Sequence, residues 1–302
     1  MFKSKNSMSR ALVRRETTAG YLFLLPSLFF FVTFVLYPMF LCIYTSFFDS
    51  NMGKNAVDVF VGLGNYKELF RDKLFLGALK NTVLIVVVAV PTVCAFSLWV
   101  ATAIYDMKPA LTSAFRCIFY LPVVTGSVAV TVVWKWMYNN RYGVFNYLFK
   151  SLGIIDQNIN WLGDARFALW CIILILFTTS VGQPIVLYVS ALGNVDHSLV
   201  EAAEVDGANR RQVFWKIKWA QIMPTTLYIL IITTINSFQC FALIQLLTSG
   251  GPTHSTDTIM YYIYYTAFKL YRYGYGNAMG VVLMIIIAVL SAVQFKLGQQ
   301  SD

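Results

Sequence analysis

Six long stretches without a charged residue constrain this chain more than any other feature. They cover residues 17–48, 82–105, 117–134, 167–195, 219–256 and 273–295. A helix rises about 1.5 Å per residue, so about 20 apolar residues cross a hydrocarbon core of about 30 Å. Six such runs in 302 residues indicate membrane spans rather than the buried core of a soluble protein. We therefore predict an all-α membrane protein with six transmembrane helices.

The whole chain, residues 1–302, is predicted to form a single transmembrane domain. Its parts are a tail at 1–20 and spans at about 21–47, 82–105, 115–138, 167–193, 222–248 and 276–297. The first apolar stretch is longer than a signal-peptide core and ends without a small-residue cleavage site, so we expect it to remain as a span. A shorter run at 258–268 cannot span, and its four tyrosines favour a helix at the membrane–water boundary.

Positive charge gathers at the N-terminus. Five Lys or Arg residues and one acid precede residue 17. By the positive-inside rule this tail is cytoplasmic, and six spans return the C-terminus to the same side. Membrane topology then explains the net charge of +9, and we expect no nucleic-acid partner. The five cysteines and two histidines are scattered without a CxxC pair, so we expect no disulfide framework, metal site or other cofactor.

The segment 198–220 differs from the apolar stretches on either side of it. Residues 198–218 hold three acids and four bases. Burying seven charges in lipid, at about 3 kcal/mol each, would cost roughly 20 kcal/mol. Because four spans precede the segment, we predict that it lies on the cytoplasmic side.

Helix signals divide this charged segment in two. Ser198 and Glu201 have the spacing of a capping box, and Gly207 stands where a left-handed C-terminal cap would fall. Asn209 and Gln212 repeat the start signal. The pattern predicts two short helices joined by a tight turn. These residues alone leave two interpretations open, an amphipathic linker on lipid headgroups or a rigid docking surface for a cytoplasmic partner.

The same segment carries a set of residues with a family resemblance. The set is Glu201, Ala202, Ala203, Asp206, Gly207 and Ala208, followed by Phe214, Ile217 and Pro224. It resembles the EAA motif of permease subunits in binding-protein-dependent ABC importers. The resemblance implies their type I permease fold, with a cytoplasmic pair of coupling helices at 198–220 that sits in a cleft of the ATPase. This chain has Trp219-Ala220 where the family usually has a Leu-Pro pair, so the resemblance does not fix where the second helix ends.

Three further segments resemble the carbohydrate-uptake, maltose-type branch of that family. They are FVGLGNY at 60–66; Trp134, Trp136, Tyr142, Gly143 and Asn146; and LTSGGP at 247–252 with Tyr264, Ala267 and Phe268. Their order most resembles the first of the two paired permeases. The resemblance implies ATP-driven uptake of a sugar or oligosaccharide across a bacterial inner membrane.

The resemblance also implies a set of partners. These are a second, related permease subunit, a dimer of cytoplasmic ATPases, an extracytoplasmic solute-binding protein, a carbohydrate substrate and the lipid bilayer. The chain itself has no Gly-x-x-x-x-Gly-Lys-Ser/Thr phosphate loop. We therefore expect it not to be an enzyme, with ATP hydrolysis carried by the partner.

Polar residues within two spans are the candidates for a substrate path. They are Gly182 and Gln183 in the fourth span, and Asn236, Ser237 and Gln239 in the fifth. Asn236 and Gln239 share a helix face at i, i+3 spacing, and the Gly-Gln-Pro sequence at 182–184 predicts a helix irregularity. In the maltose permeases that the chain resembles, the binding residues come from these same two spans. The alternative is hydrogen bonding between helices, which is common for such residues in membrane bundles.

Two other classes of protein are the rival interpretations. A secondary transporter or channel usually carries charged residues within its spans for ion coupling, and the charge-free stretches offer none. A membrane-embedded enzyme would need a carboxylate pair, a nucleophile with its base or a metal cluster, and the spans contain none of these. The sequence leaves open which sugar is carried, its length, and whether a sugar-like polyol phosphate replaces it.

Overall fold

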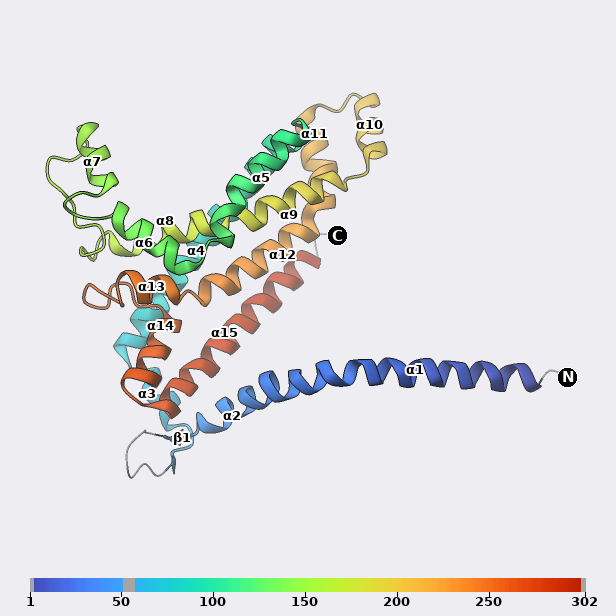
Figure 1. Ribbon diagram of the computed structural model, residues 1–302, viewed down its shortest axis with the longest axis horizontal. Helices are drawn as coiled ribbons and strands as arrows, with labels where there is room; N and C mark the ends of the chain where they lie inside the picture. Colours follow the sequence, from blue (N-terminus) through green and yellow to red (C-terminus); the bar gives the residue numbers. More distant parts are fainter. Residues whose placement is uncertain (1–2, 51–57, 300–302) are drawn as a thin grey trace.

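The computed structural model describes residues 3–50 and 58–299, with side chains at 16–50 and 58–298. The predicted all-α membrane fold is confirmed, because five helical segments are long and apolar enough to cross a membrane and a bent pair completes a sixth (Figure 1). The first span, Glu16–Thr45, is built from α1 (Lys3–Phe31), the π-helix η1 (Val32–Leu36) and α2 (Tyr37–Thr45); the second is α4 (Lys73–Tyr105), and the third is the bent pair α5 (Pro109–Val124) and α6 (Ser127–Met137). The fourth span consists of α8 (Ala168–Ser180) and α9 (Gly182–Gly193). The fifth, Arg210–Leu247, is built from α11 (Arg210–Val213), the π-helix η2 (Phe214–Lys218), α12 (Trp219–Phe238) and α13 (Ala242–Leu247), and the sixth is α15 (Tyr273–Gln299).

The remaining short elements gather at the two ends of the long helices. The antiparallel strands β1 (Phe48–Asp49) and β2 (Val59–Phe60), with α3 (Gly64–Leu69), α7 (Val144–Ser151), α14 (Ile259–Tyr264) and the π-helix η3 (Tyr265–Lys269), lie away from α10 (His197–Val205) (Figure 1). The helix expected at 258–268 is present as α14 and η3. Its Tyr261 and Tyr262 are only 7% and 6% exposed, so these two rings pack in the core instead of lining a membrane boundary.

The third span is a bent pair rather than the single helix expected at 115–138. The axes of α5 and α6 meet at 95°. Thr125 and Gly126 between them have extended backbone, with ψ near 126° and 141°. Pro122, inside the last turn of α5, cannot donate a backbone N–H to that turn. The chain therefore turns sharply at this elbow while remaining apolar on both sides of it.

The fourth and fifth spans are also interrupted. Val181 separates α8 from α9, where the sequence predicts an irregularity, and its carbonyl oxygen accepts a hydrogen bond from the buried Ser97 hydroxyl at 3.2 Å. The fifth span breaks near Gln239 and resumes as α13. On its other side, α12 continues η2 without a break, so residues 210–238 form one uninterrupted rod.

Helix α4 lies at the centre of the bundle and packs against α8, α9 and α12. Its buried residues recur every three or four positions, which places them on one face. Small and β-branched residues dominate that face, so neighbouring helices approach closely. Ile185 and Tyr188 of α9 and Ile222 and Ile229 of α12 complete this core, and all four are fully buried.

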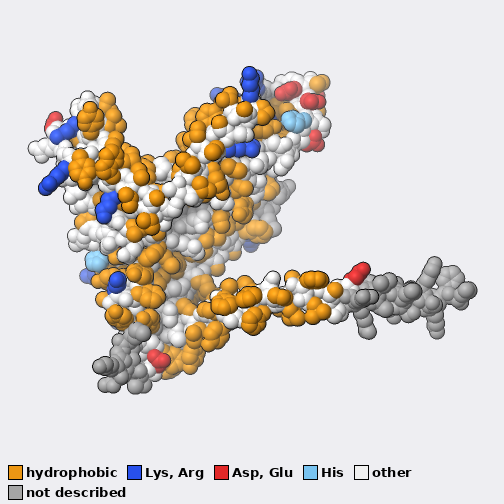
Figure 2. Space-filling model, in the orientation of Figure 1, with side chains coloured by type: hydrophobic (Ala, Val, Ile, Leu, Met, Phe, Trp, Pro, Cys, Tyr) orange, Lys and Arg blue, Asp and Glu red, His pale blue; other side chains and the backbone are white. Residues whose placement is uncertain are grey.

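Helix α1 leaves the bundle as a separate arm (Figure 1). None of its most apolar window within Glu16–Thr45 is buried against the rest of the chain. Hydrophobic side chains cover the part of the arm nearest the bundle (Figure 2). This apolar surface requires lipid or another protein around it, because its side chains have no other way to leave water.

Asp72 joins three helices, α4, α14 and α15, at the end of the bundle that carries α3. Its side chain caps α4 by accepting from the N–H groups of Leu74 and Phe75 at 2.8 and 3.3 Å. Its second oxygen accepts from the hydroxyls of Tyr262 and Tyr275, at 2.7 and 2.8 Å. Burial of this carboxyl raises its pKa, but the four hydrogen bonds outweigh that effect and the pKa is lowered.

We expect Asp72→Ala to lower the free energy of unfolding by about 3 kcal/mol, because it removes a helix cap and two charge-assisted hydrogen bonds. Thermal unfolding in detergent measures this. A carboxyl with a lowered pKa stabilises the fold above its ordinary pKa of about 3.9 and loses that contribution as pH falls through the lowered value. As the pH falls below about 3.9, the free energy of unfolding of the wild-type protein should therefore decrease more than that of Asp72→Ala. Asp164→Ala, which removes a surface pair with Arg166, is the control and should change stability little.

Candidate functional site

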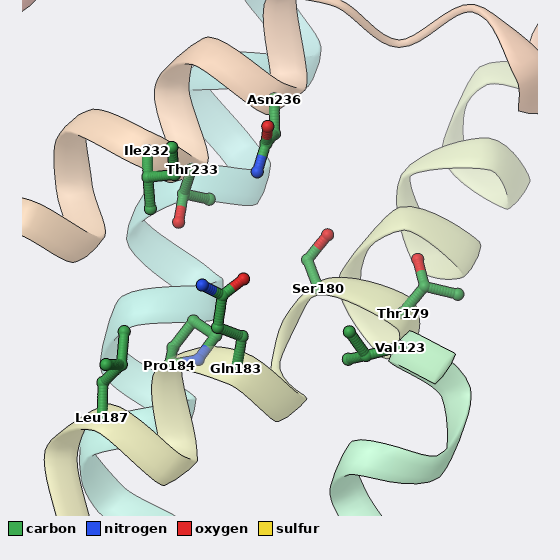
Figure 3. Close-up of a pocket in the computed structure, with 9 residues that line it drawn as sticks. All are labelled: Val123, Thr179, Ser180, Gln183, Pro184, Leu187, Ile232, Thr233 and Asn236. Atoms are coloured by element: carbon green, nitrogen blue, oxygen red, sulfur yellow. The ribbon is translucent and has the colours of Figure 1, made fainter. Parts of the chain in front are cut away.

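A cavity of about 150 Å³ lies where the end of α5 at the elbow, the break between α8 and α9, and the last two turns of α12 meet. Its lining residues are Val123, Thr179, Ser180, Gln183, Pro184, Leu187, Ile232, Thr233 and Asn236 (Figure 3). Apolar and polar side chains are interspersed around it. Two of the five residues expected to form a substrate path, Gln183 and Asn236, are thus brought together from helices more than fifty positions apart.

Three polar side chains of this cavity are available to a ligand. The carboxamides of Gln183 and Asn236 point into the space between α9 and α12, and the hydroxyl of Ser180 lies beside them (Figure 3). Within the described part of the chain, no protein group hydrogen-bonds to these three side chains. Carboxamides can both donate and accept, and such groups facing a cavity are usually satisfied by water or ligand.

The other three predicted residues lie outside the cavity wall. Gly182 is buried where α9 meets α5, and a Cβ there would collide with the carbonyl oxygen of Phe119. Ser237 is 2% exposed and belongs to the packed side of α12. Gln239 is exposed at the break after α12. Gly182 therefore contributes close helix packing, which lets α5 approach the break in the fourth span.

Three hydroxyl residues of the cavity were not anticipated from the sequence. Thr233 precedes Asn236 by one turn, and Thr179 and Ser180 end α8 just before the break. The Thr179 hydroxyl bonds to the carbonyls of Ile175 and Leu176 at 2.9 and 3.1 Å. Their proximity to Gln183 and Asn236 in sequence was the only available signal.

A second hollow of about 270 Å³ adjoins the first along the elbow. Val123 and Thr179 line both. The additional lining residues are Pro122, Thr125, Ser127, Val130 and Leu243. The bend between α5 and α6 therefore extends the hollow toward the end of the bundle that carries α13.

The charged segment 198–220 lies at the opposite end of α9 and α12. Helix α10 begins at His197, and its cap is Asp196, which accepts from the N–H and the hydroxyl of Ser198 at 2.9 and 2.7 Å. The expected capping box of Ser198 and Glu201 is therefore wrong by two positions. The hydrogen bonds from the Ser198 hydroxyl and backbone lower the pKa of Asp196.

The turn after α10 is the one that Gly207 predicts. Gly207 has a φ of +83°, and its N–H donates to the Glu204 carbonyl at 3.0 Å. The Ala208 N–H donates to the Ala203 carbonyl at 2.9 Å, which completes a Schellman motif. The predicted capping box of Asn209 and Gln212 follows, with reciprocal hydrogen bonds of 2.8 and 2.9 Å. These bonds fix the angle between α10 and α11.

The second helix does not end within the segment, because η2 continues into α12 through Trp219. The side chains of the motif differ in exposure. Glu201, Ala202, Asp206 and Gly207 are exposed, whereas Ala203, Ala208, Phe214 and Ile217 are half-buried. Acidic side chains gather on α10 (Figure 2). The exposed part of α10 therefore presents acidic and small side chains, together with the exposed apolar side chains of Leu199 and Val205.

Comparisons with known proteins agree with this architecture. Residues 15–299 match the family described as the binding-protein-dependent transport system inner membrane component. A probable ABC transporter permease protein of Bacillus subtilis strain 168, YesP, is 33% identical over 94% of this chain and 91% of its own. The lactose transport system permease protein LacF of Rhizobium radiobacter is 32% identical, with 94% and 95% covered. A solved bacterial alginate ABC transporter, in complex with an alginate pentasaccharide-bound periplasmic protein, contains a chain of the same fold, with a TM-score of 0.80, 23% identity and 93% of each chain covered.

Proposed function

This chain belongs to the family of binding-protein-dependent transport system inner membrane components, and we propose that it is the permease subunit of an ATP-driven importer of sugars or short oligosaccharides. One observation carries the proposal. The two helices whose carboxamides face the cavity, α9 and α12, are the same two helices that hold the charged segment 198–220. Displacing that segment must therefore displace the cavity walls.

The proposed mechanism is alternating access driven from the charged segment. The ATPases close on ATP and carry α10 with them. The rod of residues 210–238 transmits the movement to Asn236, and α9 transmits it to Gln183. Nucleotide can shift the equilibrium between inward and outward states only by its different affinities for the two. Glu201, Ala202, Ala203, Asp206, Gly207 and Ala208, with Phe214 and Ile217, are the proposed coupling residues.

Carbohydrate is the proposed substrate class. Sugar hydroxyls both donate and accept hydrogen bonds, and the carboxamides of Gln183 and Asn236 do the same. Leu187 and Ile232 offer apolar surface for the sugar's C–H groups. Relatives of this chain include a lactose permease, and its fold recurs in an alginate importer, which supports this class.

The proposed assembly contains three kinds of protein partner. A second, related permease packs beside the bundle, two ATPases bind on the cytoplasmic side, and a solute-binding protein delivers the sugar from outside. The apolar arm of α1, which has no cover within the described chain, would be enclosed by that permease and by lipid. Both termini would lie on the cytoplasmic side of a bacterial inner membrane, in line with the basic N-terminal tail.

Reconstituted uptake tests this proposal. The chain, its second permease and its ATPase are purified together, placed in liposomes, and supplied with the sugar-loaded binding protein. We expect accumulation of labelled sugar only when ATP is inside the vesicles and the binding protein outside. Uptake by this chain alone, driven by a proton or sodium gradient without ATP, would instead establish a secondary transporter.

A further inference from the structure

The charges of segment 198–220 are divided between its two helices. The acids Glu201, Glu204 and Asp206 lie on α10 or its cap, whereas the bases Arg210, Arg211, Lys216 and Lys218 lie on α11 and η2. No ion pair between the two sets occurs among the described side chains. Arg211 and Lys216, which are both exposed, are therefore accessible to an external anionic partner.

Aromatic side chains accompany the basic set. Trp215 is 60% exposed although its ring contacts those of Phe214 and Trp219, with centroids 5.2 and 5.5 Å apart. Arg211 precedes Trp215 by four residues, and Lys216 follows it directly; both are exposed. An exposed indole between two cations is unfavourable in water but suits the membrane–water interface, where the ring meets glycerol and acyl groups and the cations meet phosphate.

The depth of this patch is fixed by a contact with α4. The Lys218 ammonium lies 5.4 Å from the centre of the Tyr105 ring. Tyr105 is the last residue of α4 and of the charge-free stretch 82–105, and Trp219 is the first residue of the charge-free stretch 219–256. Lys218 therefore marks the edge of the hydrocarbon layer, and Arg211, Trp215 and Lys216 lie within two turns outside it, at headgroup level.

We propose that Arg211, Trp215 and Lys216 form a binding site for the headgroup of an anionic phospholipid in the adjoining leaflet. Lys216 and Arg211 pair with the phosphate, and Trp215 packs on the glycerol region. The proposed ligand is a lipid rather than the ATPase because of where the two surfaces lie. The Trp215 ring lies close to the start of the apolar stretch at Trp219, whereas the acidic surface of α10 lies farther from that stretch. The assignment of the cytoplasmic leaflet rests on the proposed function; the site itself requires only that the chain spans a membrane.

The test measures retained lipid on the full-length protein by native mass spectrometry. Protein is taken from nanodiscs that contain phosphatidylcholine and phosphatidylglycerol in equal amounts. We expect the wild type to retain phosphatidylglycerol preferentially, and the double variant Arg211→Gln, Lys216→Gln to reduce that preference about thirtyfold. Trp215→Ala should reduce retention of both lipids. A matched control, Arg141→Gln with Lys150→Gln, removes two exposed bases at the opposite end of the bundle and should change neither.

Each other outcome overturns the site. Equal retention of the two lipids by the wild type, or an equal loss in the control variant, would show that the three residues are not the site. Displacement by millimolar inorganic phosphate alone would indicate a site for free anions. If the double variant retains lipid like the wild type but no longer co-purifies with the ATPase in phosphatidylcholine, then Arg211, Trp215 and Lys216 bind the ATPase instead. None of these measurements needs sugar or ATP, so the result is independent of whether the transport assay succeeds.

Discussion

Gly207→Pro should abolish sugar uptake, by about a hundredfold or more, while the complex still assembles and hydrolyses ATP. Proline locks φ near −65° and has no N–H, whereas Gly207 needs a φ of +83° and donates to Glu204. The substitution removes the Schellman turn and frees the angle between α10 and α11. Uptake and ATP hydrolysis measured in the same proteoliposomes should then no longer be linked, and added sugar-loaded binding protein should no longer stimulate ATP hydrolysis.

Two variants separate this effect from general misfolding. Gly207→Asn should retain most of the uptake, because asparagine tolerates the left-handed region. Gly153 ends α7 in the same kind of turn, with a φ of +68°. Its N–H donates to the Lys150 carbonyl at 3.0 Å, and the Ile154 N–H donates to the Phe149 carbonyl at 2.9 Å. Gly153→Pro breaks that motif at the other end of the bundle and should leave uptake linked to ATP hydrolysis. If Gly207→Pro transports normally, the coupling assignment is wrong.

Replacing both Gln183 and Asn236 by alanine should reduce sugar uptake about a hundredfold at low sugar concentration. Each carboxamide that loses its hydrogen bonds to the substrate removes roughly 1–2 kcal/mol of binding free energy, or about tenfold in affinity. The single variants should each show about a tenfold loss. Initial uptake rates across a range of loaded binding protein measure the change, and ATP hydrolysis without substrate should stay unchanged.

The neighbours of Asn236 supply the controls. Ser237→Ala changes a residue on the packed side of α12, and Gln239→Ala changes an exposed residue at the break; neither lines the cavity. Both should transport within about twofold of the wild type if the cavity is the sugar site. A loss in Ser237→Ala equal to that in Asn236→Ala would mean that helix packing, not ligand contact, explains the effect.

The features of the fold that the sequence predicted are those determined by residues close together in the chain. Charge-free length predicted the spans, and the left-handed requirement at Gly207 and the reciprocal bonds of Asn209 and Gln212 predicted the turn and the second helix start. Asp196 was overlooked as a cap because Ser198, two residues later, had an equally good spacing to an acid. Adjacent capping residues compete, and sequence alone does not rank them.

The parts that did not follow depend on how helices meet. The 95° elbow lies inside an apolar stretch, where Pro122 and Gly126 are local signals for a break but do not give the angle of the bend. Ser180 and Thr233 were missed because hydroxyl residues in membrane helices usually bond to their own backbone, as Thr179 does. Which of them faces a cavity depends on the packing of α5, α9 and α12. Gly182 was predicted to line the substrate path, but the structure places it at the close approach of α5, outside the cavity wall.

In the uninterrupted rod of residues 210–238, the number of residues determines the direction in which each side chain points. Successive residues of a helix are about 100° apart, so one inserted or deleted residue between Val213 and Asn236 would turn Asn236 away from the cavity while its sequence neighbours stayed the same. The π-helix η2, closed by a bond from the Trp219 N–H to the Phe214 carbonyl, already winds one residue more into its turn than an α-helix does. The number of residues in this rod therefore determines which of its side chains face the cavity.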